Sequence, residues 1–233
     1  MGLDELGPFE PEEKIIEYAI ADGSKKRLVD LSMTAFVHET ASESPAPGGG
    51  SIAASMGAMG AALATMVANL SSHKRGWDDR WEEFSDWAVK GKAHHDELLR
   101  LIDEDTDAFN KIMDAFGLPK GSDAEKAERD KAIQAATKYA IEIPFRVMQA
   151  AYDSMEVIKA MAEHGNPNSV SDAGVGAICA RSAVMGAYLN VRINSGELAD
   201  KTFVKDILAK GKEIETQAMA QENEILKIVN GKI

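Results

Sequence analysis

The residue best placed for proton-transfer chemistry in this sequence is an aspartate near its middle, Asp105. It belongs to the acidic run 103–107 and lies within a series of apolar residues at helical spacing. Two stripes fit that spacing, and both pass through Asp105: Leu98, Ile102, Phe109 and Ile112, or Leu98, Leu101, Ala108 and Ile112. Because residues three and four apart share a helix face, we expect Asp105 to point inward and the other acids of the run to face solvent.

An inward carboxyl group has two interpretations. Desolvation raises the pKa of a carboxyl group towards the range that is useful for general acid–base catalysis. The alternative is a structural aspartate that caps or bonds a neighbouring helix, since buried polar groups need hydrogen-bond partners. The helical spacing alone is compatible with both.

A second candidate feature is the segment 44–51, Ser-Pro-Ala-Pro-Gly-Gly-Gly-Ser, which directly precedes a helix without charges. Pro45 and Pro47 keep the chain out of helix, and the three glycines permit unusual backbone dihedrals. Free amide groups at such a helix start, together with the positive end of the helix dipole, can hold an anion. No Gly-Lys-Ser/Thr follows, so this is not a Walker A loop, and a tight structural turn is the alternative.

Polar residues elsewhere could contact a ligand. Asn190 and Asn194 lie one helical turn apart and are expected to face inward, where their amides could bind a polar heterocycle or tie helices together. Lys74, Arg75 and Lys120 are expected at the surface, where they would suit an anionic ligand tail.

Neither a metal site nor a catalytic triad is predicted. The five histidines form no ligand set, because His94 and His95 are adjacent and no Cys or His pair has metal-ligand spacing. Ser51 has no His and Asp arranged in a recognisable nucleophile motif, which argues against a hydrolase triad.

The helix that follows the glycines, at about residues 50–72, has two contrasting faces. One face is small throughout: Gly50, Ala54, Gly57, Ala61, Ala64 and Ala68. The opposite face is large and apolar: Ile52, Met56, Met59, Leu63, Met66 and Leu70. A helix that is apolar all round is buried in a core or a membrane, and its Ala, Gly and Ser content favours the central helix of a bundle.

A second helix repeats this pattern, since small residues from Gly176 to Ala187 lead to Asn190 and Asn194 on one face. The two small faces are expected to pack closely, within the chain or across a dimer. Other helices are predicted at about 10–20, 30–42, 77–116, 122–164 and 200–229. Gly91 and Pro144 are expected to interrupt two of them, and Ser122 with Glu125 predicts a capping box.

Composition supports an all-α class for this chain of 233 residues, because helix formers dominate and no alternating β-branched run persists. Thirty-eight acidic against twenty-six basic residues give a formal charge of -12, which argues against nucleic acid as the main partner. The single cysteine, Cys179, excludes an intrachain disulfide, and the N-terminus lacks the features of a signal peptide. A cytoplasmic location is therefore expected.

Five segments in fixed order carry a family resemblance. They are Ser-Pro-Ala-Pro-Gly-Gly-Gly-Ser, Leu-Ile-Asp-Glu-Asp-Thr-Asp-Ala-Phe, Leu-Pro-Lys, Gly-Asn-Pro-Asn-Ser-Val-Ser-Asp and Gly-Ala-Tyr-Leu-Asn-Val-Arg-Ile-Asn. Together they resemble the cyclodeaminase domain of formiminotransferase-cyclodeaminase and its stand-alone relatives, the cyclodeaminase/methenyltetrahydrofolate cyclohydrolase family. The resemblance covers residues 28–233, and residues 1–27 are interpreted as an N-terminal helical arm or linker.

This resemblance implies an all-helical, homodimeric enzyme of one-carbon metabolism and histidine degradation, with a tetrahydrofolate derivative as substrate and no tightly bound cofactor. The reaction expected is closure of 5-formimidoyltetrahydrofolate to 5,10-methenyltetrahydrofolate with release of ammonia. One alternative is a methenyltetrahydrofolate cyclohydrolase, and another is a non-catalytic helical partner of a separate formiminotransferase. No nucleic-acid or membrane partner is expected.

The resemblance also assigns site residues. By motif, the family's catalytic aspartate falls on Asp105. The pterin and one-carbon site would be lined by Gly48, Gly49, Gly50, Ser51, Asn166, Asp172, Asn190 and Asn194. Lys74, Arg75 and Lys120 are candidates for holding the glutamate tail of a folate that could be polyglutamylated.

Overall fold

The structure is a computed structural model that describes residues 27–233, and every regular element in that range is a helix. In chain order they are η2 (Leu28–Asp30), α3 (Met33–Thr40), α4 (Gly49–Ser72), η3 (Asp78–Arg80), α5 (Trp81–Gly117), α6 (Asp123–His164), η4 (Pro167–Ser169), α7 (Val170–Asn194), η5 (Ser195–Glu197) and α8 (Lys201–Asn230). The predicted all-α class is confirmed. The helix expected at about residues 10–20, and almost all of the arm expected at 1–27, lie outside the described residues.

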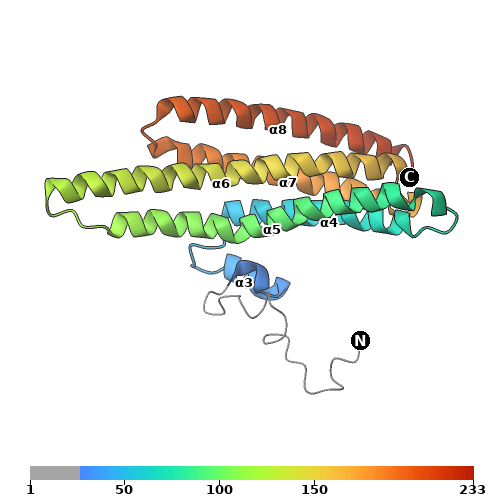
Figure 1. The fold of residues 1–233 in the computed structure, drawn as a ribbon, viewed down its shortest axis with the longest axis horizontal. Coiled ribbons are helices and arrows are strands. Elements are labelled where there is room, and N and C mark those ends of the chain that lie inside the picture. Colours follow the sequence, from blue (N-terminus) through green and yellow to red (C-terminus); the bar gives the residue numbers. More distant parts are fainter. Residues whose placement is uncertain (1–26) are drawn as a thin grey trace, which may run out of the picture.

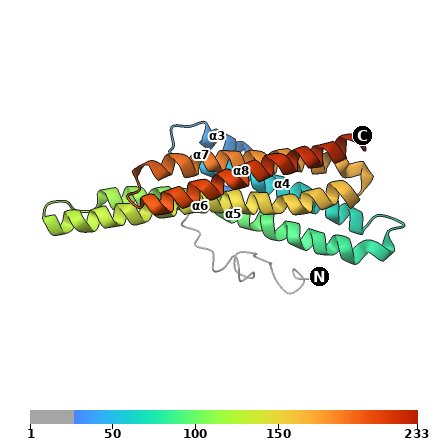
Figure 2. The same ribbon diagram turned by 90° about the horizontal axis from the view of Figure 1, so that it is seen from above.

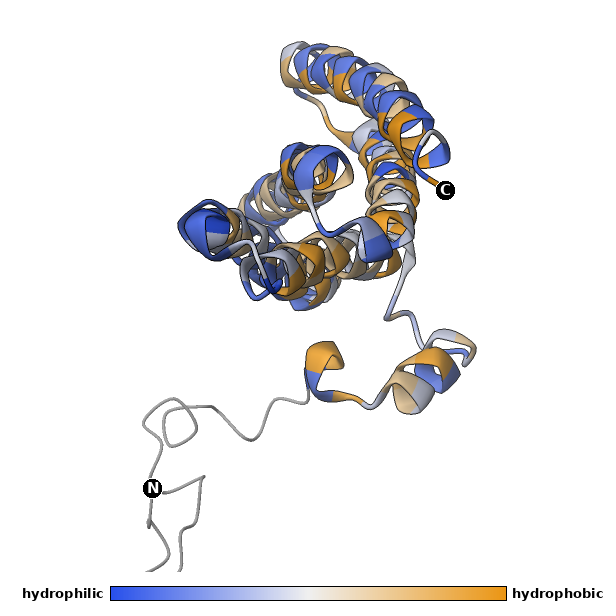
Figure 3. Cartoon of the chain, turned by 90° about the vertical axis from the view of Figure 1, so that its right-hand side faces the viewer, coloured by the Kyte–Doolittle hydropathy of each residue, from blue (hydrophilic) through white to orange (hydrophobic). Residues whose placement is uncertain are grey.

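Five long helices lie side by side in a bundle, with the short α3 to one side (Figure 1). Helix α4 contacts α5, α6 and α7, while α8 packs on α7 and α6 (Figure 2). Viewed along the bundle, η2 and α3 form a separate small layer (Figure 3). Leu28, Val29 and Phe36 of this layer pack partly buried against the core of the bundle, and the Leu28 backbone amide donates to Asp103 at 2.6 Å.

The two faces of α4 have different environments. Its small face is buried, from Gly50 to Ala68, as the sequence predicts. The large face was expected to be buried too, yet Met59, Met66 and Leu70 are 44%, 37% and 46% exposed. Within residues 27–233, α4 is the one helix long and apolar enough to cross a membrane, and 61% of its most apolar window is buried inside the molecule.

Small residues let α4 approach its neighbours closely. A Cβ atom at Gly60 would lie 2.8 Å from the carbonyl oxygen of Gly176 on α7. A Cβ atom at Gly91 would lie 2.4 Å from the Thr65 hydroxyl oxygen, so Gly91 serves the packing of α5 on α4. Helix α5 continues through Gly91 without the predicted break.

Helix α6 begins at the predicted capping box, in which Ser122 and Glu125 bond each other's backbone amides. It continues past Pro144, which was expected to kink or restart it, and Pro144 is buried inside the helix. Helix α5 ends at Gly117, before Leu118 and Pro119, as predicted.

Candidate active site

Four helices meet around a small cavity of about 130 Å³: the N-terminus of α4, the second half of α5, α6 at Ala140 and the C-terminal part of α7. Among the described residues, its lining is mostly small or apolar, with one carboxyl group, one hydroxyl group and two side-chain amides. The lining residues are Pro45, Ala46, Gly48, Gly49, Gly50, Asp105, Thr106, Ala108, Phe109, Ile112, Ala140, Asn190 and Asn194.

Because α4 runs antiparallel to both α5 and α7, the first turn of α4 lies beside Asp105 of α5 and Asn190 of α7. A Cβ atom at Gly50 would lie 2.1 Å from Oδ1 of Asp105 on α5, and one at Gly49 would lie 3.2 Å from Nδ2 of Asn190 on α7. The glycines are therefore needed here because the side chains of two neighbouring helices occupy the space beside them.

Asp105 receives its hydrogen bonds from the first turn of α4. The Ser51 hydroxyl donates to its Oδ2 at 3.0 Å, and the Ser51 backbone amide also bonds the carboxyl group. The N-cap of α4 is Gly48, which has no side chain to satisfy the first amides of the helix. Asp105, which belongs to α5, thus caps the N-terminus of α4 and also lines the cavity. Both interpretations of this inward aspartate, as a helix cap and as a candidate acid–base group, therefore fit the structure.

The pKa of Asp105 is raised above its usual range because burial disfavours the charged form, and the bonds from Ser51 only partly offset this effect. Asp105 is the one ionisable residue among the described residues that line the cavity. A carboxyl group whose pKa is raised in this way can act as a general acid or base.

The two asparagines make different contacts. Nδ2 of Asn190 donates to the carbonyl oxygen of Gly186 in its own helix at 2.9 Å. Nδ2 of Asn194 donates to the carbonyl oxygen of Ala140 on α6 at 2.8 Å, so this residue ties two helices. Both also line the cavity, where their amide oxygens can accept hydrogen bonds from a ligand.

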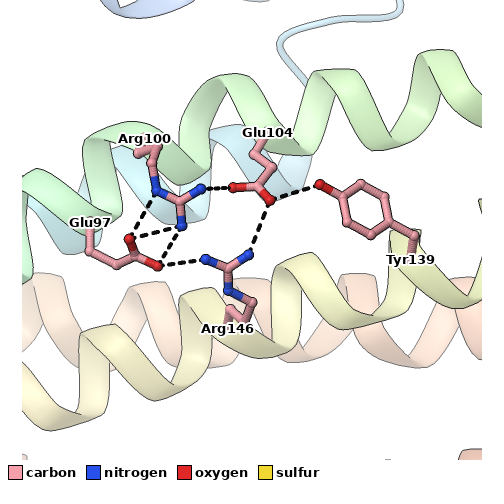
Figure 4. Close-up of polar contacts among 5 residues, drawn as sticks. All are labelled: Glu97, Arg100, Glu104, Tyr139 and Arg146. Atoms are coloured by element: carbon pink, nitrogen blue, oxygen red, sulfur yellow. Dashed lines mark hydrogen bonds and ion pairs between the residues drawn. The ribbon is translucent and has the colours of Figure 1, made fainter.

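The acids beside Asp105 do not form a solvated face, contrary to the prediction. Glu104 accepts hydrogen bonds from the Tyr139 hydroxyl at 2.7 Å and from Arg146 at 3.0 Å, and it also pairs with Arg100 (Figure 4). Glu97 extends this network by bonding both arginines. Helical spacing turns Glu104 towards α6, so these partners hold α5 and α6 together one residue from Asp105.

Five of the predicted ligand contacts lie away from the cavity in this chain. The Asn166 backbone amide donates to the Ser71 hydroxyl oxygen at 2.8 Å. Ser71 lies at the opposite end of α4 from Gly49, roughly 30 Å away at a rise of 1.5 Å per residue. Asp172 lies in the first turn of α7, also at that end. The sequence analysis grouped these two with the glycines by motif, and the length of α4 and α7 separates them.

The basic candidates for a glutamate tail lie on the segments that follow α4 and α5. Lys74 and Arg75 follow the C-terminus of α4, where the Lys74 ammonium lies 3.8 Å from the centre of the Trp77 ring. Lys120 lies between α5 and α6, beyond the end of α5 at Gly117. None of the three lines the cavity.

The sequence analysis missed one polar lining residue and misplaced another. Thr106 lines the cavity, and its hydroxyl oxygen is the one buried side-chain polar atom without a hydrogen-bond partner in the described part of the chain. Its position next to Asp105 was the available signal. Ser51, predicted to contact substrate, is fully buried and reaches Asp105 instead of the cavity.

Comparisons with known proteins identify the family of this chain. The family model described as formiminotransferase-cyclodeaminase matches residues 32–213. Formimidoyltransferase-cyclodeaminase from Rattus norvegicus is 36% identical over 87% of this chain, which spans only 38% of that longer protein. Methenyltetrahydrofolate cyclohydrolase from Methylorubrum extorquens is 35% identical over 85% of this chain and 95% of its own length.

Among solved structures, a formiminotetrahydrofolate cyclodeaminase from Thermotoga maritima superposes with a TM-score of 0.76 at 32% identity. The match covers 86% of this chain and 96% of that one. Sequence and fold therefore agree over most of the described residues, and the chain belongs to the formiminotransferase-cyclodeaminase family.

Proposed function

We propose that this chain is a formimidoyltetrahydrofolate cyclodeaminase, which closes 5-formimidoyltetrahydrofolate to 5,10-methenyltetrahydrofolate and releases ammonia. The observation that carries the proposal is the Asp105 carboxyl group, which has a raised pKa and is the one ionisable side chain that residues 27–233 contribute to the cavity. The likeness to a cyclodeaminase of almost the same length supports the choice of reaction.

The chemistry requires one group that takes a proton and returns it. N10 of the folate attacks the carbon of the protonated formimidoyl group, and a C–N bond forms. Asp105 accepts the proton from N10 and gives it to the nitrogen of the former imine, whose C–N bond then breaks to release ammonia. Because ring closure is intramolecular, holding N10 against the carbon supplies much of the rate.

The cavity suits the reacting end of such a substrate. Its volume of about 130 Å³ is below the roughly 300 Å³ at which pockets begin to enclose drug-sized ligands, so the rest of the folate extends outside it. The amide oxygens of Asn190 and Asn194 can accept hydrogen bonds from the pterin. The tetrahydrofolate is a substrate here, and the proposed chemistry calls for no tightly bound cofactor.

The second candidate is methenyltetrahydrofolate cyclohydrolase, and the relative of that name from Methylorubrum extorquens favours it. In this reaction water attacks the bridging carbon, and Asp105 takes a proton from the water and gives it to N5. The bond from that carbon to N5 then breaks, and the new hydroxyl group releases its proton to solvent to form the formyl oxygen. The same carboxyl group can perform both reactions, which differ in the nucleophile.

We further propose that the chain forms a homodimer through the large face of α4. Met59, Met66 and Leu70 on this face are partly exposed in the single chain, although a helix apolar all round is ordinarily buried. Helix α3 has eight residues, none of them buried, and helices of that length are marginal in water without a packing surface. A second copy of the chain would cover both the large face of α4 and helix α3. Met66→Glu would place a charge in this interface, so light scattering should then report a monomer.

The remaining alternative is a non-catalytic partner of a separate formiminotransferase in the cytoplasm, since several relatives combine both activities in their names. A single assay distinguishes the candidates. Purified protein is offered formimidoyl- and methenyltetrahydrofolate in parallel, with methenyl absorbance and ammonia both recorded. Ammonia release supports the deaminase, loss of methenyl absorbance supports the hydrolase, and absence of both with no folate binding supports the partner.

A further inference from the structure

The buried hydroxyl group of Ser51 lies between two acceptors on α5. Its oxygen is 3.0 Å from Oδ2 of Asp105 and 3.1 Å from the carbonyl oxygen of Ile102. Ser51 is fully buried and does not line the cavity, so it contacts the acid and not a ligand.

A hydroxyl group has one proton to donate and can also accept a hydrogen bond. When Asp105 is ionised, its carboxylate is the stronger acceptor, and the Ser51 proton points to Oδ2. When Asp105 is protonated, its own O–H can donate to the Ser51 oxygen, which frees the Ser51 proton for the carbonyl oxygen of Ile102. Each protonation state therefore has a fully paired arrangement.

We propose that Ser51 is a positioning residue whose hydroxyl group reverses direction with each change in the protonation of Asp105. The reversal is a rotation about the Cβ–Oγ bond and moves no heavy atom. The carboxyl group can then act first as base and afterwards as acid from one position, without the reorganisation that a mobile acid would need. The benefit of this reversal for catalysis rests on the proposed function. The reversal itself depends only on the contact between Ser51 and Asp105.

Among residues 27–233, Ser51 is the side chain that hydrogen-bonds this carboxyl group. The cavity receives glycines from α4, Ala140 from α6 and asparagines from α7, none of them ionisable. On α5 itself, Asp103 accepts from the Leu28 amide and Glu104 is held by Tyr139 and arginines, while Asp107 lies two residues away.

The test is the titration of Asp105 in Ser51→Ala and Ser51→Cys, with Ser55→Ala as matched control. Ser55 lies one turn further along α4, and its hydroxyl group donates to the Ile52 carbonyl of its own helix at 2.8 Å. Carbon-13 NMR of labelled aspartate carboxyl groups reports the pKa, with the Asp105 signal assigned by its loss in Asp105→Asn. Because the anion loses the stronger bond, we expect the pKa of Asp105 to rise by about one pH unit in Ser51→Ala, less in Ser51→Cys, and not in Ser55→Ala.

Kinetics give a second readout. In Ser51→Ala the acidic limb of the pH–rate profile should shift to higher pH, because the pKa of Asp105 rises. We also expect kcat to fall while KM stays unchanged. A carboxyl group that titrates as in the wild type overturns the proposal, as does a raised KM at unchanged kcat, which would place the hydroxyl group on the substrate. If Ser51→Ala fails to fold, Ser51→Cys decides by the same criteria. The NMR titration needs no turnover, so it remains decisive if the folate assay finds no activity.

Discussion

Asn194 satisfies the carbonyl group that Pro144 leaves without its helical partner. Proline has no backbone N–H, so the carbonyl of Ala140, four residues earlier, lacks its usual donor. Nδ2 of Asn194 on α7 donates to this oxygen at 2.8 Å. The proline and the asparagine therefore act as a pair that fixes the register of α6 against α7 beside the cavity.

This pairing predicts a non-additive effect on stability. Asn194→Ala should lower the free energy of unfolding by about 1–3 kcal/mol, because the Ala140 carbonyl loses its partner. In a Pro144→Ala background the restored N–H supplies a donor, and the same change should cost less. Urea denaturation of the double-mutant cycle measures the coupling, and additivity within roughly 0.5 kcal/mol would contradict the pairing.

Gly50→Ala should displace Asp105. The added Cβ would lie 2.1 Å from Oδ1 and 2.6 Å from Cγ of the carboxyl group, so α4 and α5 must separate or the acid must turn away. Since a displacement of about 1 Å can cost on the order of 100-fold in rate, we expect kcat to fall by at least that factor. Gly196→Ala is the control, because a Cβ at Gly196 meets nothing within 4 Å, and equal losses in both variants would contradict this account.

Asp105→Asn tests the pH dependence of stability. The native pKa of Asp105 is raised above the usual 3.8, so between these two values the native state binds more protons than the unfolded state. The free energy of unfolding contributed by Asp105 therefore falls as pH rises through this window. The stability of Asp105→Asn relative to wild type should increase across the window and then level off, while activity is lost. Urea titrations at successive pH values measure the difference, and a constant difference would argue against a raised pKa.

Thr106→Val should stabilise the free protein. Threonines inside helices can bond the carbonyl four residues earlier, as the partly buried Thr65 does with Ala61 at 2.8 Å. For Thr106 that carbonyl belongs to Ile102, which already accepts from Ser51, and the Thr106 hydroxyl oxygen has no partner. Removing an unpaired buried hydroxyl should raise the free energy of unfolding by about 1 kcal/mol. Thr65→Val should lower it or leave it unchanged, and thermal denaturation distinguishes the two.

Tyr139→Phe should weaken the contact between α5 and α6. The Tyr139 hydroxyl donates to Glu104, and burial beside this carboxylate raises the pKa of Tyr139 to about 12. Loss of a hydrogen bond to a charged group should cost about 1.5–3 kcal/mol in urea denaturation, with KM unchanged because Tyr139 does not line the cavity. Tyr152→Phe on the same helix is the control, and equal stability of both variants would contradict the role of the network.

The sequence correctly predicted the features that depend on a single helix, namely which of its residues face the interior. Periodicity placed Asp105 inward and the small faces of α4 and α7 in the interior, and both predictions are confirmed. The other predictions depend on pairs of helices. Asn166 and Asp172 share a motif with the family's site and stay predictions, because in this chain they lie at the opposite end of the bundle from the cavity. Glu104 was wrongly expected to face solvent, because Tyr139 and Arg146, which bond it, come from α6. Register between helices is set by packing, which a single sequence does not display.

The cavity has a consequence for the order in which the protein can be made. Its lining runs from Pro45 to Asn194, so a nascent chain on the ribosome holds Asp105 and the glycines long before the asparagines emerge. Helix α8 contributes no residue to the lining in the described part of the chain, yet it packs on both α6 and α7. When α8 is synthesised, all the lining residues are already present, and its packing on α6 and α7 holds them in place. Substitutions in α8 should therefore change the yield of folded protein and leave the chemistry at the cavity unchanged.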